Sequence, residues 1–116
     1  MTVNETVIKS LEQFGKPVKP DHYEGKEKEY FIFNFVDDVA DEFGDDEPLR
    51  VISYLQIHYF LPMDKDYLEM KKKIRKALFK NGFTYPSVTI MTEPEKKIRH
   101  LIFECEIEND GELDGE

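Results

Sequence analysis

The segment covering residues 49–107 constrains the fold more than any other part of the chain. Apolar side chains alternate with others over 49–61 and stop before a proline, which predicts a β-strand with one buried face. An amphipathic helix is predicted over 64–81, since its apolar residues recur at helical spacing. Two further strands, around 88–90 and 101–107, follow as a hairpin. Together these elements predict a small α+β domain.

The first half of the chain supplies one more helix and one more strand. Thr2 and Glu5 have the spacing of a capping box and precede an apolar stripe that ends at Gly15. The prolines within 16–28 predict an extended connector without regular pairing. Residues 30–36 are aromatic and β-branched, which predicts a strand.

The predicted order of elements is therefore α-β-β-α-β-β. It indicates a single small, mostly antiparallel sheet with helices packed on one face. We expect residues 1–108 to form one domain, because 116 residues leave no room for a second core. Residues 109–116 are mostly acidic or glycine and are expected to form a disordered tail.

Bulk composition narrows the class of protein. Sixteen basic and twenty-five acidic residues give a net charge of -9, which argues against general or sequence-specific binding of nucleic acid. Cys105 is the only cysteine and alternates with apolar neighbours, so we expect a buried, inert thiol. No leader peptide and no apolar stretch long enough to cross a membrane is apparent. The sequence thus predicts a soluble protein of the cytoplasm.

Apolar residues outnumber the positions that one sheet face can bury. The predicted strand at 30–36 is largely apolar on both faces, and Ile52, Tyr54 and Phe60 lie opposite the core face of the next strand. Helices cover only one face, so the other needs a second layer. A neighbouring subunit is a natural candidate, and we place Ile52 and Tyr54 in that interface.

Two charged segments have opposite sign. Residues 37–48 are too long and too acidic for a tight turn, and we expect a mobile loop. Its carboxylates do not keep the register of a calcium-binding loop, so a solvated or partner-facing segment is expected. The loop could face a basic helix on the next subunit of a ring. The residues of this interface are Asp37, Asp38, Asp41, Glu42, Asp45, Asp46 and Glu47 in the loop, and Lys72, Lys76 and Lys80 on the helix.

A charged, solvated outer face is the ordinary role of such helix lysines, and the subunit contact is an alternative to it. The same lysines also suit contact with phosphate. His22, His58 and His100 lack the spacing of zinc ligands, although His58 and His100 could meet across paired strands. We find no Gly-rich phosphate loop and no nucleophile with a base. We therefore expect no catalytic residues, no metal and no cofactor.

Three stretches carry a resemblance to a known family. They are Tyr54-Leu55-Gln56-Ile57-His58-Tyr59-Phe60, the run from Lys71 to Phe83, and Arg99-His100-Leu101-Ile102-Phe103-Glu104. In these stretches, and over most of residues 1–108, the chain resembles small minor tail or tail-completion proteins of long-tailed phages and prophages. It is similar to the tail terminators of lambda-like phages.

The resemblance implies a structural protein without catalytic residues. Such a protein forms a six-fold ring on the last ring of the tail tube, stops tube growth and offers a docking face to the head. Its partners are then further copies of itself, the tail-tube protein and a head-completion or connector protein. Its place is the virion tail, and the host cytoplasm during assembly. The acidic loop and tail have no counterpart in the family pattern.

Two alternatives remain open at this point. A head-completion or connector protein of the same size shares the same elements. The second alternative is a monomeric acidic module that imitates DNA or occupies a basic partner. A ring-forming subunit should give higher oligomers in solution, whereas this module should stay small.

Overall fold

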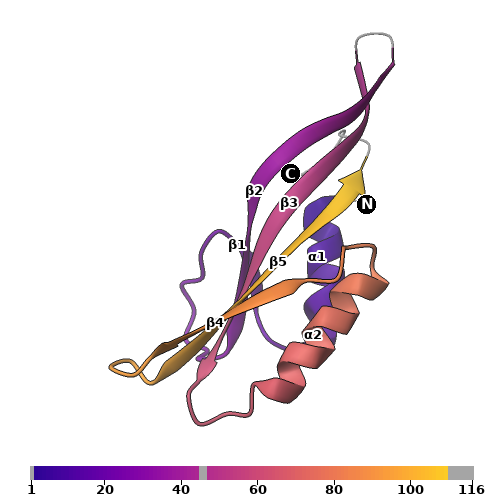
Figure 1. Ribbon diagram of the computed structural model, residues 1–116. Helices are drawn as coiled ribbons and strands as arrows, with labels where there is room; N and C mark the ends of the chain where they lie inside the picture. The colour runs from indigo at the N-terminus through magenta and orange to yellow at the C-terminus, as the bar shows by residue number, and fades with distance from the viewer. Residues whose placement is uncertain (1, 45–46, 110–116) are drawn as a thin grey trace.

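The computed structural model describes residues 2–44 and 47–109, with the backbone alone for 41–44 and 47–49. It confirms an α+β fold with a five-stranded, mostly antiparallel sheet (Figure 1). The strands lie in the order β1-β2-β3-β5-β4, and only the β1-β2 pair is parallel. The elements are α1 (Val3–Leu11), the 3-10 helix η1 (Glu12–Phe14), β1 (Val18–Pro20), β2 (Tyr30–Gly44), β3 (Glu47–Pro62), α2 (Leu68–Lys80), β4 (Ser87–Glu93) and β5 (Ile98–Asn109).

The first helix begins at the predicted capping box but ends at Leu11, and the 3-10 helix η1 continues the chain to the predicted glycine. The Thr2 hydroxyl accepts from the Glu5 backbone N–H at 3.1 Å, and the Glu5 carboxylate accepts from the Thr2 N–H at 2.8 Å. This capping box satisfies two amide groups that a helix start leaves without partners. At the other end Gly15 has a φ of 68°, a left-handed conformation that glycine adopts without strain.

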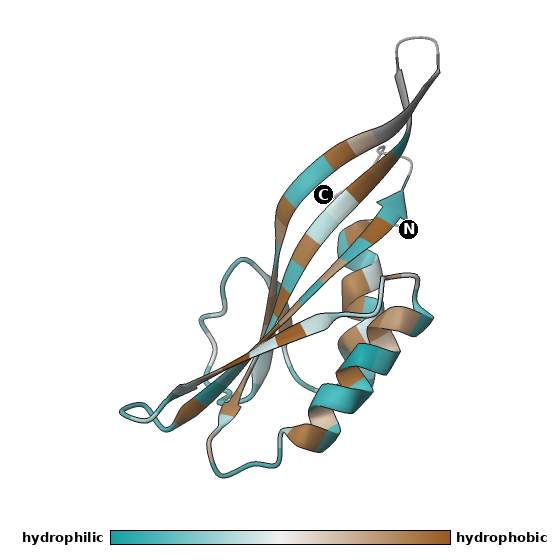
Figure 2. Ribbon diagram, viewed as in Figure 1, coloured by the Kyte–Doolittle hydropathy of each residue, from teal (hydrophilic) through white to brown (hydrophobic). Residues whose placement is uncertain are grey.

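Both helices cover the same face of the sheet, which we call the inner face (Figure 1). Alternate residues of the strands point into this layer, and Figure 2 shows apolar residues alternating with more polar ones along β3. The core cluster is Val3, Val7, Leu11, Phe31, Phe33, Leu55, Ile57, Tyr59, Leu61, Ile74, Leu78, Phe83, Leu101, Phe103 and Cys105. The predicted strand faces and helix stripes are thus confirmed.

The prediction of a mobile acidic loop over 37–48 was wrong. β2 continues to Gly44 and β3 begins at Glu47, so most of this segment is a long antiparallel hairpin, the arm, which projects beyond the rest of the sheet (Figure 1). The register shifts between Phe35 and Asp37, which leaves Val36 as a bulge. Strand formation here depends on the pairing partner, because aspartate alone disfavours a strand. The molecule measures 54 × 26 × 24 Å along its principal axes.

The prediction that 16–28 lacks regular pairing was also wrong. Val18–Pro20 pairs in parallel with β2, because the hydrogen bonds need no proline N–H. Instead the Pro17 carbonyl accepts from the Phe31 N–H at 2.8 Å, and the Asp21 N–H donates to the Phe33 carbonyl at 2.9 Å. A proline is compatible with pairing wherever its missing donor is not required.

Two predicted boundaries shift. α2 begins at Leu68 rather than near Asp64, because Pro62 to Lys65 closes a turn and the Asp66 carboxylate accepts from the Leu68 N–H at 3.0 Å. At the C-terminus Asn109 is still part of β5. The rest of the predicted acidic tail, 110–116, lies outside the described residues.

Candidate interaction surface

The second face of the sheet, the outer face, has no helix over it in the part of the chain that the structure describes (Figure 1). Its side chains are those that alternate with the core residues, and most are partly buried among one another. They are Tyr30, Ile32 and Asn34 of β2, Ile52, Tyr54, Gln56, His58 and Phe60 of β3, and His100, Ile102, Glu104 and Glu106 of β5. The sequence predicted that the apolar residues in excess of the core would lie on this face.

A row of aromatic rings in contact with one another crosses one end of the outer face. Ring centroids lie 4.6 Å apart for Tyr23 and Tyr30, 4.8 Å for Tyr30 and Phe60, and 4.1 Å for Phe60 and His100. The register pairs Phe60 with Tyr30 on one side and with His100 on the other. Such contacts stabilise cross-strand pairs. A hollow of about 970 Å³ adjoins Tyr23 and Tyr30 at the end of the row.

The two strand histidines meet, as the sequence allowed. His58 Nε2 lies 2.9 Å from Asn34 Oδ1, which can only accept, so this nitrogen carries the hydrogen. In the neutral ring His58 Nδ1 then accepts from His100 Nε2, at 2.8 Å. Burial lowers the pKa of His58, and burial together with the nearby His58 lowers the pKa of His100 to about 4. Both rings are therefore neutral at pH 7.

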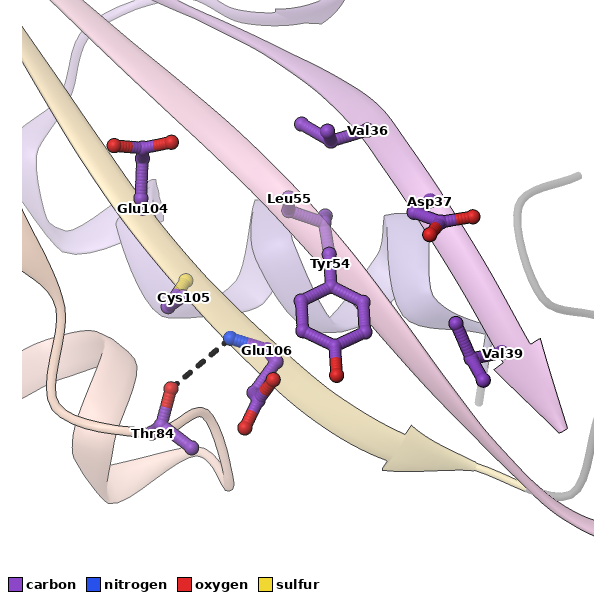
Figure 3. A pocket seen from close by; sticks show the side chains of 9 residues that line it. All are labelled: Val36, Asp37, Val39, Tyr54, Leu55, Thr84, Glu104, Cys105 and Glu106. Atoms are coloured by element: carbon purple, nitrogen blue, oxygen red, sulfur yellow. Dashed lines mark hydrogen bonds between the residues drawn. The ribbon is translucent and has the colours of Figure 1, made fainter. Parts of the chain in front are cut away.

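An acidic hollow lies on the outer face at the base of the arm. Its volume is about 440 Å³, and the strands β2, β3 and β5 supply most of its lining (Figure 3). Three carboxylates, of Asp37, Glu104 and Glu106, surround apolar surface from Val36, Val39 and Tyr54. We call these six residues the acidic patch. Val36 is 57% exposed and Val39 is 44% exposed, although both are apolar.

The solvent-facing side of α2 combines positive charge with exposed apolar side chains. Lys72, Lys76 and Lys80 are exposed along it, and Leu68 and Phe79 on the same side are 57% and 59% exposed. We call these five residues the basic face. The inward stripe of α2, including Ile74 and Leu78, is fully buried. Most surface helices keep large apolar residues on the buried side, so Leu68 and Phe79 are unusual.

The predicted interface residues do not all share one surface. Asp37, Ile52 and Tyr54 lie on the outer face, where Ile52 pairs with Val39. Asp38 pairs with Ser53 on the inner side, and the buried Ser53 hydroxyl donates to the Asp38 carboxylate. Asp38 is therefore on the opposite side of the sheet from Asp37. Of the remaining acids, Asp41, Glu42 and Glu47 are placed in the backbone of the arm, and Asp45 and Asp46 lie outside the described residues.

Sequence reasoning missed Val36, Val39, Leu68 and Phe79. Val39 falls in the segment interpreted as a loop. Val36 ends the strand predicted at 30–36, where the bulge breaks the alternation that would have shown which side it faces. Phe79 was recognisable as an apolar residue outside the helix stripe. Glu104 and Glu106, which pair with Gln56 and Tyr54, are both on the outer face.

The remaining chemistry of the described residues is limited. Over 2–44 and 47–109 no group of three or more His, Cys, Asp or Glu side chains could hold a metal ion. Cys105 is 7% exposed, and burial raises the pKa of its thiol to about 12, so it is unreactive at neutral pH. Neither described helix is long and apolar enough to span a bilayer.

Comparison with protein-family models and with curated proteins finds no match for this chain.

Proposed function

We propose that this protein is a structural subunit of a phage tail that forms a ring at the end of the tail tube. The ring ends tube growth and presents a surface to which the head joins. The observation that carries this proposal is the outer face, an apolar and aromatic sheet surface without a covering layer from the described chain. Partly exposed apolar surface that no layer covers is typical of a protein interface.

Ring formation also explains the arm. A hairpin that projects from a subunit of this size extends contacts to a neighbour, and its base carries exposed Val36 and Val39. Contacts between two different surfaces of the same chain produce closed rings when the rotation closes. The resemblance of 54–60, 71–83 and 99–104 to tail terminators supports the same function. The proposed partners are other copies, the tail-tube protein and a head-completion or connector protein, in the virion tail and in the host cytoplasm during assembly.

One observation favours a second candidate. The acidic patch gathers three carboxylates around a hollow on a chain of net charge -9, and a monomeric module that binds a basic partner would also expose such a surface. That module would stay monomeric, whereas a ring subunit associates with itself.

The terminator role is tested by deleting the gene in the phage or prophage that encodes the chain. We expect tails of uncontrolled length in electron micrographs, since nothing stops the tube. Tails of normal length that lack heads would instead assign the protein to head completion. Normal, infectious particles would contradict both roles.

A further inference from the structure

We infer that the basic face of α2 in one copy docks on the acidic patch of the next copy. The inference rests on the proposed ring and names the interface that closes it. It differs from the sequence-based expectation, which placed the acidic side of the contact in a mobile loop over 37–48. The carboxylates are instead those of Asp37, Glu104 and Glu106, held by three paired strands.

The two surfaces have complementary chemistry. The acidic patch offers apolar contact from Val36, Val39 and Tyr54 inside a ring of negative charge. The basic face offers Phe79 and Leu68 among three lysines. Docking would remove exposed apolar surface on both sides while pairing opposite charges at the rim, which is the usual anatomy of a protein interface.

Charges on both surfaces are available for a partner. Among described residues, no ion pair within the chain uses the carboxylates of Asp37, Glu104 or Glu106. The same holds for the ammonium groups of the basic face, again counting only the described part of the chain. Glu104 accepts one long hydrogen bond, 3.5 Å, from Gln56, and Asp37 accepts from the adjacent Asp38 N–H. These contacts leave the negative charges uncompensated.

The spacing of the charges matches. Asp37, Tyr54 and Glu106 are in register across β2, β3 and β5, so the two carboxylates are separated by two strand spacings, about 10 Å. Glu104 lies two residues before Glu106 on the same strand face, at about 7 Å. Lysines four residues apart on α2 are separated by about 6 Å along the helix axis. Flexible lysine side chains easily span the difference.

The location of the two surfaces requires a head-to-tail contact. The acidic patch is on the outer face of the sheet, and the basic face is on the far side of the helices that cover the inner face. In a two-fold symmetric dimer, both surfaces would have to belong to one interface on one side of each subunit. The two surfaces lie on opposite sides, so a two-fold contact cannot pair them. A contact between the acidic patches of two copies would place carboxylates opposite carboxylates. A heterologous contact remains, and its repetition gives a ring when the rotation closes and an open filament when it does not.

Paired charge reversals test the inference. One variant carries Glu104→Lys and Glu106→Lys, and the other carries Lys76→Glu and Lys80→Glu. Matched controls with the same change in net charge are Glu24→Lys with Glu95→Lys, and Lys26→Glu with Lys19→Glu, all at exposed positions that belong to neither surface. Circular dichroism checks that every variant is folded, and the oligomer mass is measured by light scattering.

We expect each reversal alone to weaken self-association by about tenfold or more, since like charges then face each other. Mixing the two reversed variants in equal amounts should restore assembly, because each then offers the charge that the other lacks. The controls should assemble as the unaltered chain does.

Several results would overturn the inference. If the unaltered chain assembles and both reversals assemble equally well, the interface lies elsewhere and the proposed ring still stands. If a mixture fails to restore assembly, the two surfaces are not partners. If the Lys76 and Lys80 reversal leaves the mass unchanged but abolishes retention of duplex DNA in a gel shift, the basic face binds nucleic acid. If the unaltered protein is monomeric, both this inference and the proposed ring are contradicted.

Discussion

His100 lies between Phe60 and His58 on the outer face, and this environment opposes its protonation. In the unfolded chain a histidine titrates near pH 6.5, whereas the pKa of His100 in the fold is about 4. Below pH 6.5 the unfolded chain therefore binds a proton that the folded chain does not. The contribution of His100 to stability is complete above pH 6.5 and is lost progressively as the pH falls toward 4.

The variant His100→Gln should show a smaller loss of stability between pH 6.5 and 4 than the unaltered protein. Urea unfolding at a series of pH values measures the stability of both proteins. Subtracting one stability-against-pH curve from the other cancels the contribution of the carboxylates, which both proteins share. His22→Gln, in an exposed loop position, is the matched control and should follow the unaltered curve. Identical pH dependence of the His100 variant and the control would show that the histidine is not constrained as described.

The sheet face on which a side chain lies was predictable wherever alternation along the strand alone decides it. Burial of Cys105 and the outward placement of Ile52 and Tyr54 follow from a period of two. The stack of His100 on Phe60 was not predictable, because it depends on the register between β3 and β5. No local signal in either strand specifies that register.

Among the elements, α2 was predicted by its stripe and the arm was not predicted at all. A period of 3.6 residues is visible within one helix. Strand formation in an acidic stretch depends instead on a partner, here the first half of β3, and on a bulge that shifts the register. The short β1 was hidden for a related reason, since its hydrogen bonds use the carbonyl of Pro17 and the N–H of Asp21 and need no proline N–H.

Leu78→Ala tests how α2 is anchored. Leu78 is fully buried between the helix and the sheet, so truncation should lower the free energy of unfolding by about 2 to 5 kcal/mol. Denaturant titration measures the change. Lys80→Ala, on the exposed side of the same helix, should change it by about 0.5 kcal/mol or less. Equal effects of the two substitutions would mean that the assigned helix face is incorrect.

At the scale of the whole molecule, the central feature is its two unlike sides. One side is an uncovered sheet face with an aromatic row and an acidic patch, and the other is a helix layer with a basic face. Individual exposed ion pairs contribute only about 0.2 to 1 kcal/mol. Repeated at each interface of a closed ring, together with buried apolar surface, they favour assembly. The sequence indicated both charges, but only the fold places them on opposite sides.

The most direct test of this account is the mass of the unaltered protein in solution. Light scattering across a concentration series, at low salt so that charge pairs are little screened, should detect a species of about six times the 13.7 kDa chain mass. Electron microscopy of that species should show rings, and added salt should reduce its fraction. A mass of 13.7 kDa at every concentration would contradict the proposal that this chain acts as a ring-forming structural subunit.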